Sequence, residues 1–468
     1  MNIYLSAILI AITATSAHAQ LLQPVPKLVV NITIEQLRTD YLESFTPLYT
    51  NGGMKKMIQQ GRVYEETSYS FSPVDHASAI ASIVTGTTPY YNSIVSVQWL
   101  DKNTLRPIFC VDDSKYQTSP ANISTSTITD EMKVSSKGAA IIYAIAPLRE
   151  SAVLAAGHAG DGAFWIDDKT GTFTTSSYYS LKVQNWIKNY NKITQQPANS
   201  ESAKNAAVIK AAEACISGNL MGKDDVTDMM SISLSAKCKD ATNWQTEVES
   251  TYLQLDNLLA DFITNIENSV GKNNVLFVLT STGYQDEQNV DYHEYRIPTG
   301  TFYINRTANL LNIYLGAIYG QGRYVDACFH NEIYFNHKLI EQKRISFSDI
   351  LSRSQEFLIQ NAGVQDVFTS ERLLAGGNDV QKIRNGYNPS ISGDIRVEIV
   401  PGWQLLNEDN QENYTSRSCI VPFPIIIYGA GIKPQHIATP VTVERIAPTI
   451  ARTIHIRAPN ACKADPLP

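Results

Sequence analysis

The residues best suited to chemistry lie in one short stretch, SFSPVDHASAIASIVTG, which spans residues 70–86. This pattern is typical of a loop that turns into a helix, and it places the imidazole of His76 at the helix start. Imidazole serves in acid–base and nucleophilic catalysis near neutral pH. Asp75 precedes His76 and suggests acid–base work, but adjacent residues on a helix do not face each other. The sequence of this stretch is therefore compatible with two roles for His76, as a catalytic residue or only as the first residue of a helix.

The overall composition indicates an ordinary globular protein. The 468 residues are enough for one large α/β domain or two medium ones, and 43% of them are hydrophobic. The net charge is -7 and no run of basic residues occurs, so we expect no nucleic-acid partner. The six cysteines are an even number, which leaves disulfides and buried free thiols as open alternatives.

Residues 1–19, MNIYLSAILIAITATSAHA, are typical of a secretory signal peptide. The apolar core is too short to span a bilayer comfortably, and the small residues Ala17 and Ala19 form a cleavage pattern. No other stretch is long and apolar enough to cross a membrane. We therefore expect residues 20–468 to be secreted to the periplasm and not to span the membrane after cleavage. Association with the outer membrane is left open.

The elements that position these residues follow from hydrophobic patterns. The patterns predict three buried strands and two helices: residues 27–34, 275–279 and 424–428 for the strands, and about 243–270 and 443–454 for the helices. Strands that alternate with helices imply a mostly parallel central sheet with helices on both faces. Ligands bind such sheets at the carboxyl ends of strands, so we expect a site just after Ile34, Leu279 and Tyr428. Residues from about 100 to 215 are rich in Thr, Ser, Tyr and Lys, and are expected to form a cap insertion.

Motifs along most of the chain identify a family. They are VNITIEQLRTDYL (30–42), SIVTGTTPYYNSI (82–94), AAGHAGDGAFWIDDKTGTFTTSSYY (155–179), RIPTG (296–300), YGQGRYVDACFHNEIYFN (319–336), PFPIIIYGAGIKP (422–434) and ERIAPTIARTIHIRAPN (444–460). Together they resemble the alkaline phosphatase superfamily, most closely the bacterial phosphate-irrepressible alkaline phosphatases and their nucleotide pyrophosphatase and phosphodiesterase relatives. The resemblance spans roughly residues 25–462 and implies an alkaline-phosphatase-like α/β fold.

The resemblance also implies a catalytic site with two zinc ions and a Thr or Ser nucleophile at a helix start. Its first metal ligand falls on the carboxylate Glu35, and its nucleophile falls on His76 if no gap is introduced. A one-residue slip would bring Pro73 nearer to the family's proline. The other five positions fall on weaker ligands or on residues without a ligating side chain: Cys238, Thr242, Thr282, Gly283 and Pro422. The family's phosphate-binding groups also fall on residues of different chemistry: Leu148, Glu150 and Val97.

These replacements lead to two main hypotheses. The first is an exported pseudoenzyme, a binding or scaffold subunit for a protein partner in the cell envelope, with no catalytic residue and no cofactor expected. The alternative is an active phosphate monoester or diester hydrolase with an atypical site around His76 and zinc as its cofactor. A third hypothesis is a protein that binds a sugar or a nucleotide in the same cleft.

The alternative hypothesis names three residues that the fold would bring together. Glu35, His76 and Cys238 are its candidate metal ligands. Glu35 and His76 are also its candidate catalytic residues, with His76 as a covalent nucleophile that forms a phosphohistidine at a helix N-terminus. Equally, Glu35 could form a salt bridge, His76 could cap a helix, and Cys238 could be buried or in a disulfide.

Overall fold

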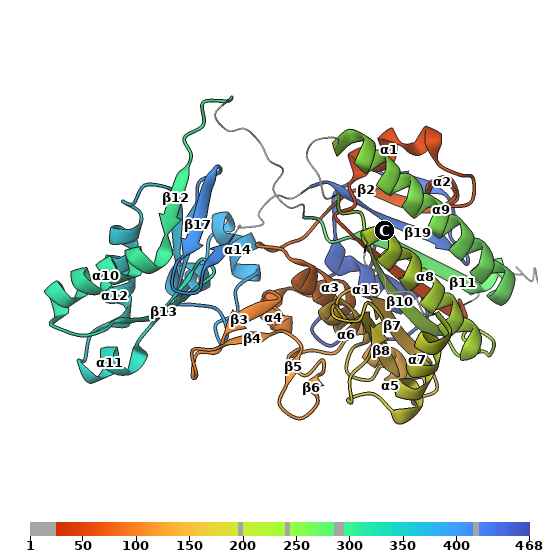
Figure 1. The fold of residues 1–468 in the computed structure, drawn as a ribbon, viewed down its shortest axis with the longest axis horizontal. Coiled ribbons are helices and arrows are strands. Elements are labelled where there is room, and N and C mark those ends of the chain that lie inside the picture. The colour runs from red at the N-terminus through yellow and green to blue at the C-terminus, as the bar shows by residue number, and fades with distance from the viewer. Residues whose placement is uncertain (1–24, 195–199, 239–243, 285–293, 415–420) are drawn as a thin grey trace, which may run out of the picture.

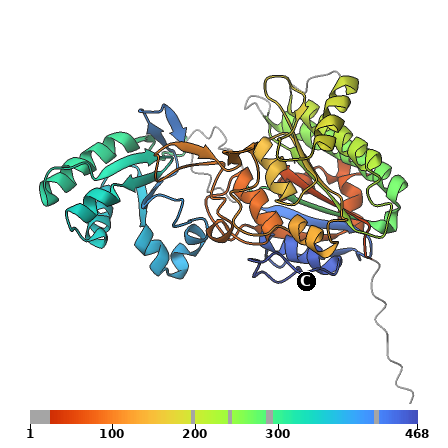
Figure 2. The same cartoon turned by 90° about the horizontal axis from the view of Figure 1, so that it is seen from below.

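The computed structural model describes residues 25–468 except for four segments: 195–199, 239–243, 285–293 and 415–420. The predicted signal peptide lies outside the described residues. The chain forms a large body built on one sheet and a smaller lobe beside it (Figures 1 and 2). Among the described residues, no helix combines the length and the apolar character that crossing a membrane requires.

A ten-stranded mixed sheet is the centre of the large body, in the order β20-β2-β19-β11-β1-β10-β7-β8-β9, with β21 paired to β2. Its strands are β1 (Leu28–Glu35), β2 (Arg62–Ser68), β7 (Ile142–Ala146), β8 (Gly162–Ile166), β9 (Phe173–Thr174), β10 (Asp228–Ser235), β11 (Val275–Ser281), β19 (Phe423–Gly429), β20 (Gln435–Ile437) and β21 (Val441–Thr442). Strands β11, β1, β10, β7 and β8 run parallel, whereas β19 is antiparallel to both of its neighbours. The three predicted strands are β1, β11 and β19, and the predicted fold class is confirmed.

Helices cover both faces of this sheet (Figure 1). They are α1 (Thr39–Ser44), α2 (Met54–Gln60), α3 (His76–Thr85), α4 (Pro89–Asn92), α5 (Ile128–Ser135), α6 (Arg149–Ala156), α7 (Leu181–Thr194), α8 (Glu201–Gly218), α9 (Trp244–Val270) and α15 (Ile446–Thr453). Helices α8 and α9 share a hydrophobic core with Leu28 and Val30 of β1. Helices α5 and α15 pack in a second core with Val29, the residue between them, because successive strand residues point to opposite faces.

The smaller lobe lies between β11 and β19 in the sequence. Its elements are β12 (Gly300–Tyr303), α10 (Ile304–Tyr319), β13 (Val325–Phe329), β14 (Glu332–Phe335), α11 (His337–Gln342), α12 (Phe347–Leu358), β15 (Val364–Thr369), α13 (Ser370–Ala375), α14 (Gln381–Asn385), β16 (Ile395–Ile399), β17 (Trp403–Asn407) and β18 (Glu412–Tyr414). They form a four-stranded sheet, a three-stranded sheet and the helices beside them.

The segment that stands apart from the main sheet is not the predicted cap insertion at residues 100–215. Residues 100–215 contribute β7, β8 and β9 to the central sheet, together with four of its covering helices. The polar composition of this range reflects its exposed connections, including the hairpin of β5 (Asp112–Asp113) and β6 (Gln117–Thr118). The separate lobe is formed by residues 300–414 instead.

The lobe contacts the large body next to the loop that leads to α3. Arg396 of β16 donates a hydrogen bond to the Ser72 carbonyl at 3.4 Å, and Asn385 of α14 donates one to the Ser70 carbonyl at 2.9 Å. Leu100, from the hairpin of β3 (Gln98–Leu100) and β4 (Pro107–Phe109), packs against Phe329 of the lobe. The lobe therefore supports the polypeptide that precedes His76.

The cysteines of the described residues are free thiols: Cys110, Cys215, Cys238, Cys328 and Cys462. Cys419 lies outside the described residues. Among the described cysteines, the alternative of free thiols is the one that the structure favours.

Candidate active site

Polar side chains line one face of the central sheet at the carboxyl ends of its parallel strands. In β1, alternate residues Asn31, Thr33 and Glu35 share the face opposite to the aliphatic Ile32 and Ile34. The parallel register brings the neighbouring strands into the same pattern: Thr33 lies opposite Ser233 and Thr280, and Glu35 lies opposite Ser235. Three adjacent strands thus end in hydroxyl and carboxylate groups on one face.

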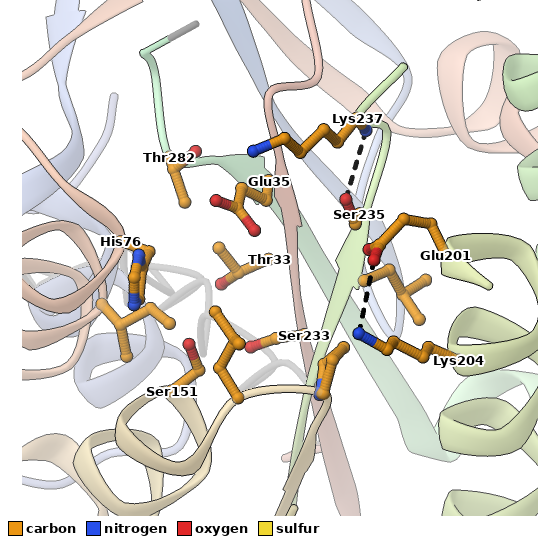
Figure 3. A pocket seen from close by; sticks show the side chains of 14 residues that line it. Thr33, Glu35, His76, Ser151, Glu201, Lys204, Ser233, Ser235, Lys237 and Thr282 are labelled. Carbon is orange, nitrogen blue, oxygen red and sulfur yellow. Dashed lines mark hydrogen bonds and ion pairs between the residues drawn. The ribbon is translucent and has the colours of Figure 1, made fainter. Parts of the chain in front are cut away.

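A cavity of about 230 Å³ lies over this polar edge (Figure 3). Thr33, Glu35, Ser233, Ser235 and Thr282 line it from the sheet. Helices α3, α6 and α8 and the segments beside them supply the other walls: His76, Ile80, Pro147, Leu148, Ser151, Glu201, Lys204 and Lys237. Glu35 and His76 therefore line the same cavity, and Figure 3 shows the imidazole across the cavity from the carboxylate.

Helix α3 holds His76 in place through its N-terminal cap. Asp75 is the N-cap residue, and its carboxylate accepts hydrogen bonds from the backbone N–H of Ser78 at 2.8 Å and of Val97 at 2.7 Å. The Ser78 hydroxyl in turn accepts a hydrogen bond from the backbone N–H of Asp75 at 3.0 Å, which completes a capping box. Asp75 is therefore a structural cap, and His76 is the first residue of the helix.

The closest partner of His76 is a carboxylate from another helix. Nε2 of His76 lies 2.5 Å from Oε1 of Glu150, the second residue of α6, and both side chains are about 14% exposed. Burial works to lower the pKa of His76, but the hydrogen bond and charge of Glu150 outweigh burial and raise it. Burial works to raise the pKa of Glu150, and the bond to His76 reverses this effect and lowers it. Each residue thus stabilises the charged form of the other.

Nothing in the spacing of the sequence signalled the pair of His76 and Glu150. Glu150 was identified only as a replacement in the family's phosphate clamp, and 74 positions separate the two residues. Of the other residues at the family's phosphate-binding positions, Leu148 lines the cavity. Val97 contributes its backbone N–H to the cap of α3. The residue predicted to replace part of the clamp therefore binds the residue predicted to replace the nucleophile.

Glu35 is held by a tyrosine from the end of β11. The buried hydroxyl of Tyr284 donates a hydrogen bond to Oε1 of Glu35. Thr282 accepts a hydrogen bond from the backbone N–H of Gln36 at 3.2 Å, which ties β11 to the residue that follows Glu35. The side chain of Glu35 lines the cavity (Figure 3).

Aromatic rings fill the other side of the family's site. Gly283 has φ of +67°, and a side chain there would collide with the ring of Phe423 and lie 2.8 Å from the ring of Tyr69. Those two rings stack on each other at 5.4 Å. Pro422 presents its carbonyl to the backbone N–H of Thr39 at 2.9 Å. These positions therefore support packing and offer no ligating side chain.

Cys238 does not join Glu35 and His76 in the cavity. Its sulfur lies 3.6 Å from the carbonyl of Ala236 and 3.7 Å from the hydroxyl of Thr251. Burial raises the pKa of the Cys238 thiol, so the ligating thiolate is disfavoured. The structure thus brings together two of the three candidate metal ligands, and Thr242 lies outside the described residues.

The fold and the cavity define an α/β protein with a polar site at the carboxyl ends of parallel strands. Residues 29–418 match the family model of type I phosphodiesterase / nucleotide pyrophosphatase. The chain therefore belongs to this family, which is one of phosphoric ester hydrolases.

Similar proteins extend this result over the whole chain. The chain is 26% identical to alkaline phosphatase PafA of Elizabethkingia meningoseptica, over 95% of this chain and 94% of the relative. It is 25% identical to alkaline phosphatase PhoV of Synechococcus elongatus, over 93% of this chain and 91% of the relative. The crystal structure of wild-type PafA matches with a TM-score of 0.82 and 25% identity, over 95% of this chain and 98% of that one.

These findings correct two predictions. The pseudoenzyme hypothesis, with its scaffold role, is wrong because relatives that match nearly the full length are alkaline phosphatases. The alternative of a phosphate ester hydrolase is better supported. The prediction that no cofactor is needed is also wrong, because the family resemblance implies zinc. The error arose because the prediction rested on the replaced positions alone, whereas the relatives match the chain over nearly its full length.

The cavity is lined by few side chains that can ligate a zinc pair. Such a pair requires several carboxylate and imidazole ligands. Within the described residues, no three His, Cys, Asp or Glu side chains converge to hold a metal ion. Glu35 and His76 alone of the candidates line the cavity, and His76 already binds Glu150. The described residues therefore do not fit a dinuclear zinc centre by themselves.

Proposed function

We propose that the protein hydrolyses phosphate esters in the cavity between Glu35 and His76. The observation that carries this proposal is the position of His76. It is the first residue of α3, the family resemblance without a gap predicts the nucleophile there, and a buried carboxylate binds its Nε2. A serine or threonine hydroxyl has to lose its proton to become a good nucleophile, whereas neutral imidazole can attack without losing a proton.

Because the hydrogen bond to Glu150 uses Nε2 of His76, the other ring nitrogen, Nδ1, is available to attack a substrate. When Nε2 donates its hydrogen to Glu150, Nδ1 carries the lone pair. Within the part of the chain that the structure describes, Nδ1 makes no hydrogen bond. Attack by Nδ1 on phosphorus would place positive charge on the ring, and the Glu150 carboxylate is positioned to stabilise that charge.

The environment of the cavity suits an anionic substrate. The ammonium groups of Lys204 and Lys237 line it, and Lys204 is paired with Glu201 at 3.4 Å. Figure 3 shows the side chain of Lys237 extending toward Glu35. The N-terminus of the ten-residue helix α3 also points its positive dipole end at the position of His76. The two lysines balance the carboxylates of Glu35 and Glu201, which also line the cavity, and the helix N-terminus favours a phosphoryl group.

The reaction would proceed in two steps. In the first, Nδ1 of His76 forms a bond to phosphorus, the bond from phosphorus to the alcohol oxygen breaks, and the alkoxide takes a proton from water. In the second, a water molecule attacks phosphorus while Glu35 accepts its proton. The N–P bond breaks, its electron pair returns to Nδ1, and phosphate leaves. Glu35 then gives its proton to the hydroxide that remained from the first step.

Turnover assays test the proposal directly. Purified protein is incubated with p-nitrophenyl phosphate and with bis-p-nitrophenyl phosphate, with and without added zinc, because the family implies that metal. We expect release of p-nitrophenol and its loss in His76→Asn. Absence of turnover of both esters under every condition would contradict the proposal.

We also propose that the protein is exported, which the pattern of residues 1–19 supports. The periplasm is the compartment predicted for it, and association with the outer membrane stays a prediction from the sequence. A protein partner in the cell envelope and the absence of a nucleic-acid partner stay predictions as well.

A further inference from the structure

A second cavity adjoins the first. It has a volume of about 240 Å³ and lies between α8 and α9. Glu201, Ser235 and Lys237 line both cavities, so the two meet at the carboxyl end of β10. A substrate whose phosphoryl group lies beside His76 would have room for its alcohol in this second space.

Seven hydroxyl and amide side chains line the second cavity, beside the charged residues Glu201, Lys237 and Glu247 and the apolar Leu255 and Leu258. Five hydroxyl residues line it, with the two amide residues Asn205 and Gln254. Among the described residues of its lining, none is aromatic. A nucleobase or a phenyl ring would find no ring to stack on, whereas an alcohol with several hydroxyl groups would find donors and acceptors.

A chain of hydrogen bonds orients three of these groups, which lie at the exposed rim of the cavity. The Ser202 hydroxyl donates to Oε1 of Gln254 at 2.6 Å, and Nε2 of Gln254 donates to the Ser250 hydroxyl at 3.0 Å. Ser202 thus keeps oxygen lone pairs that can accept, and Ser250 keeps a hydroxyl hydrogen that can donate. A hydroxyl group of a ligand is both donor and acceptor and can satisfy the two ends of this chain.

We infer that the second cavity binds the alcohol part of the substrate and that this alcohol is rich in hydroxyl groups, as in a sugar phosphate or a polyol phosphate. The inference deepens the proposed hydrolysis and rests on it. Gln254 is the central residue of the subsite, because it links the two serines.

Binding of two phosphonates by isothermal titration calorimetry tests the inference without requiring turnover. One is a hexose 6-phosphonate and the other is benzylphosphonate, and in both a methylene group replaces the oxygen that hydrolysis would cleave. We expect the wild-type protein to bind the hexose compound about tenfold more tightly, which corresponds to one or two net hydrogen bonds. Gln254→Leu should abolish this preference.

Asn257→Leu is the matched control. Asn257 is an exposed amide residue of the same helix, one turn away and outside both cavities, so its replacement should leave both affinities unchanged. Equal affinity of the wild-type protein for the two phosphonates would overturn the inference, and turnover of p-nitrophenyl phosphate in that sample would leave the hydrolysis standing. Retention of the preference without any turnover would instead overturn the hydrolysis and leave the hydroxyl-binding cavity in place.

Discussion

The two halves of the site differ in what their side chains do. On the side of β1, α3 and α6, Glu35, His76 and Glu150 form a polar wall with a charged pair. On the side of β11 and β19, Gly283 and Phe423 belong to a tightly packed aromatic region. The polar half retains an open cavity, and the aromatic half has become part of the core. The side chains suited to chemistry therefore lie on the polar side of the site.

Replacement of His76 should give the largest effect, because it removes the proposed nucleophile. We expect His76→Ala to lower kcat/KM for p-nitrophenyl phosphate by about a thousandfold or more. His436→Ala is the control, since His436 also binds a carboxylate, Glu65 at 2.9 Å, but lies on the surface. Equal activity of the two variants would remove His76 from the mechanism, provided that circular dichroism shows both to be folded.

Gly283→Ala should test the aromatic half through stability. The added methyl group meets the rings of Phe423 and Tyr69 in a backbone conformation that favours glycine. We expect a loss of about 3 kcal/mol in the free energy of unfolding, measured by urea denaturation. In Gly316→Ala, on the exposed side of α10, the new methyl group has no neighbour within 4 Å, and a gain of about 0.5–1 kcal/mol is expected. Unchanged stability of Gly283→Ala would show that the aromatic half is loosely packed.

Glu150→Gln should change the pH dependence of the reaction. Glu150 raises the pKa of His76 against the effect of burial, and Glu35 and Asp75 add to the rise. The neutral nucleophile therefore forms as pH rises through this raised pKa, and activity increases with it. The variant should show this limb of the pH–rate profile at lower pH, with a lower maximal rate. A profile that stays at the wild-type position would show that Glu150 does not control His76.

The same pair contributes to stability with a definite sign. The pKa of His76 is higher in the folded chain than in the unfolded one, so its contribution is complete below the unfolded pKa and is lost as pH rises through the folded pKa. Thermal denaturation should show a smaller loss over that range in Glu150→Gln than in the wild-type protein. An identical loss in both would mean that other groups cause it.

Two tyrosine variants should give the smallest effect and separate the halves. Tyr284 donates to Glu35, whereas Tyr69 donates to the carbonyl of Ser281 at 2.8 Å. Loss of either buried hydroxyl should cost about 1 kcal/mol of stability. A few-fold loss of kcat is expected only in Tyr284→Phe, because Glu35 then loses a positioning contact. Equal loss of kcat in Tyr69→Phe would contradict the claim that only the polar half takes part in the reaction.

Periodicity predicted the framework of the large body well. The apolar runs that became β1, β11 and β19 are buried strands, and the long pattern near 243–270 is α9. The rule that ligands bind at the carboxyl ends of strands placed Glu35 beside the cavity. These features depend on local sequence and on the general geometry of α/β sheets, so one chain suffices to find them.

The remaining features depend on contacts between distant segments. The pair of His76 and Glu150 joins α3 to α6, and the second cavity lies between α8 and α9. The alternation of Asn31, Thr33 and Glu35 within β1 was a local signal for a polar face, but it was read only as a buried strand. The separate lobe at 300–414 was missed because its sheets join distant segments, as in the pairing of β12 with β17.

The most direct test of the central claim is to trap the covalent intermediate on His76. Protein mixed rapidly with p-nitrophenyl phosphate is quenched in alkali, digested and examined by mass spectrometry. A phosphohistidine, stable in base and labile in acid, is expected on the peptide that contains His76, and it should be absent from His76→Asn. Steady turnover without any phosphate on His76, or with phosphate on another residue, would contradict the assignment of His76 as the nucleophile.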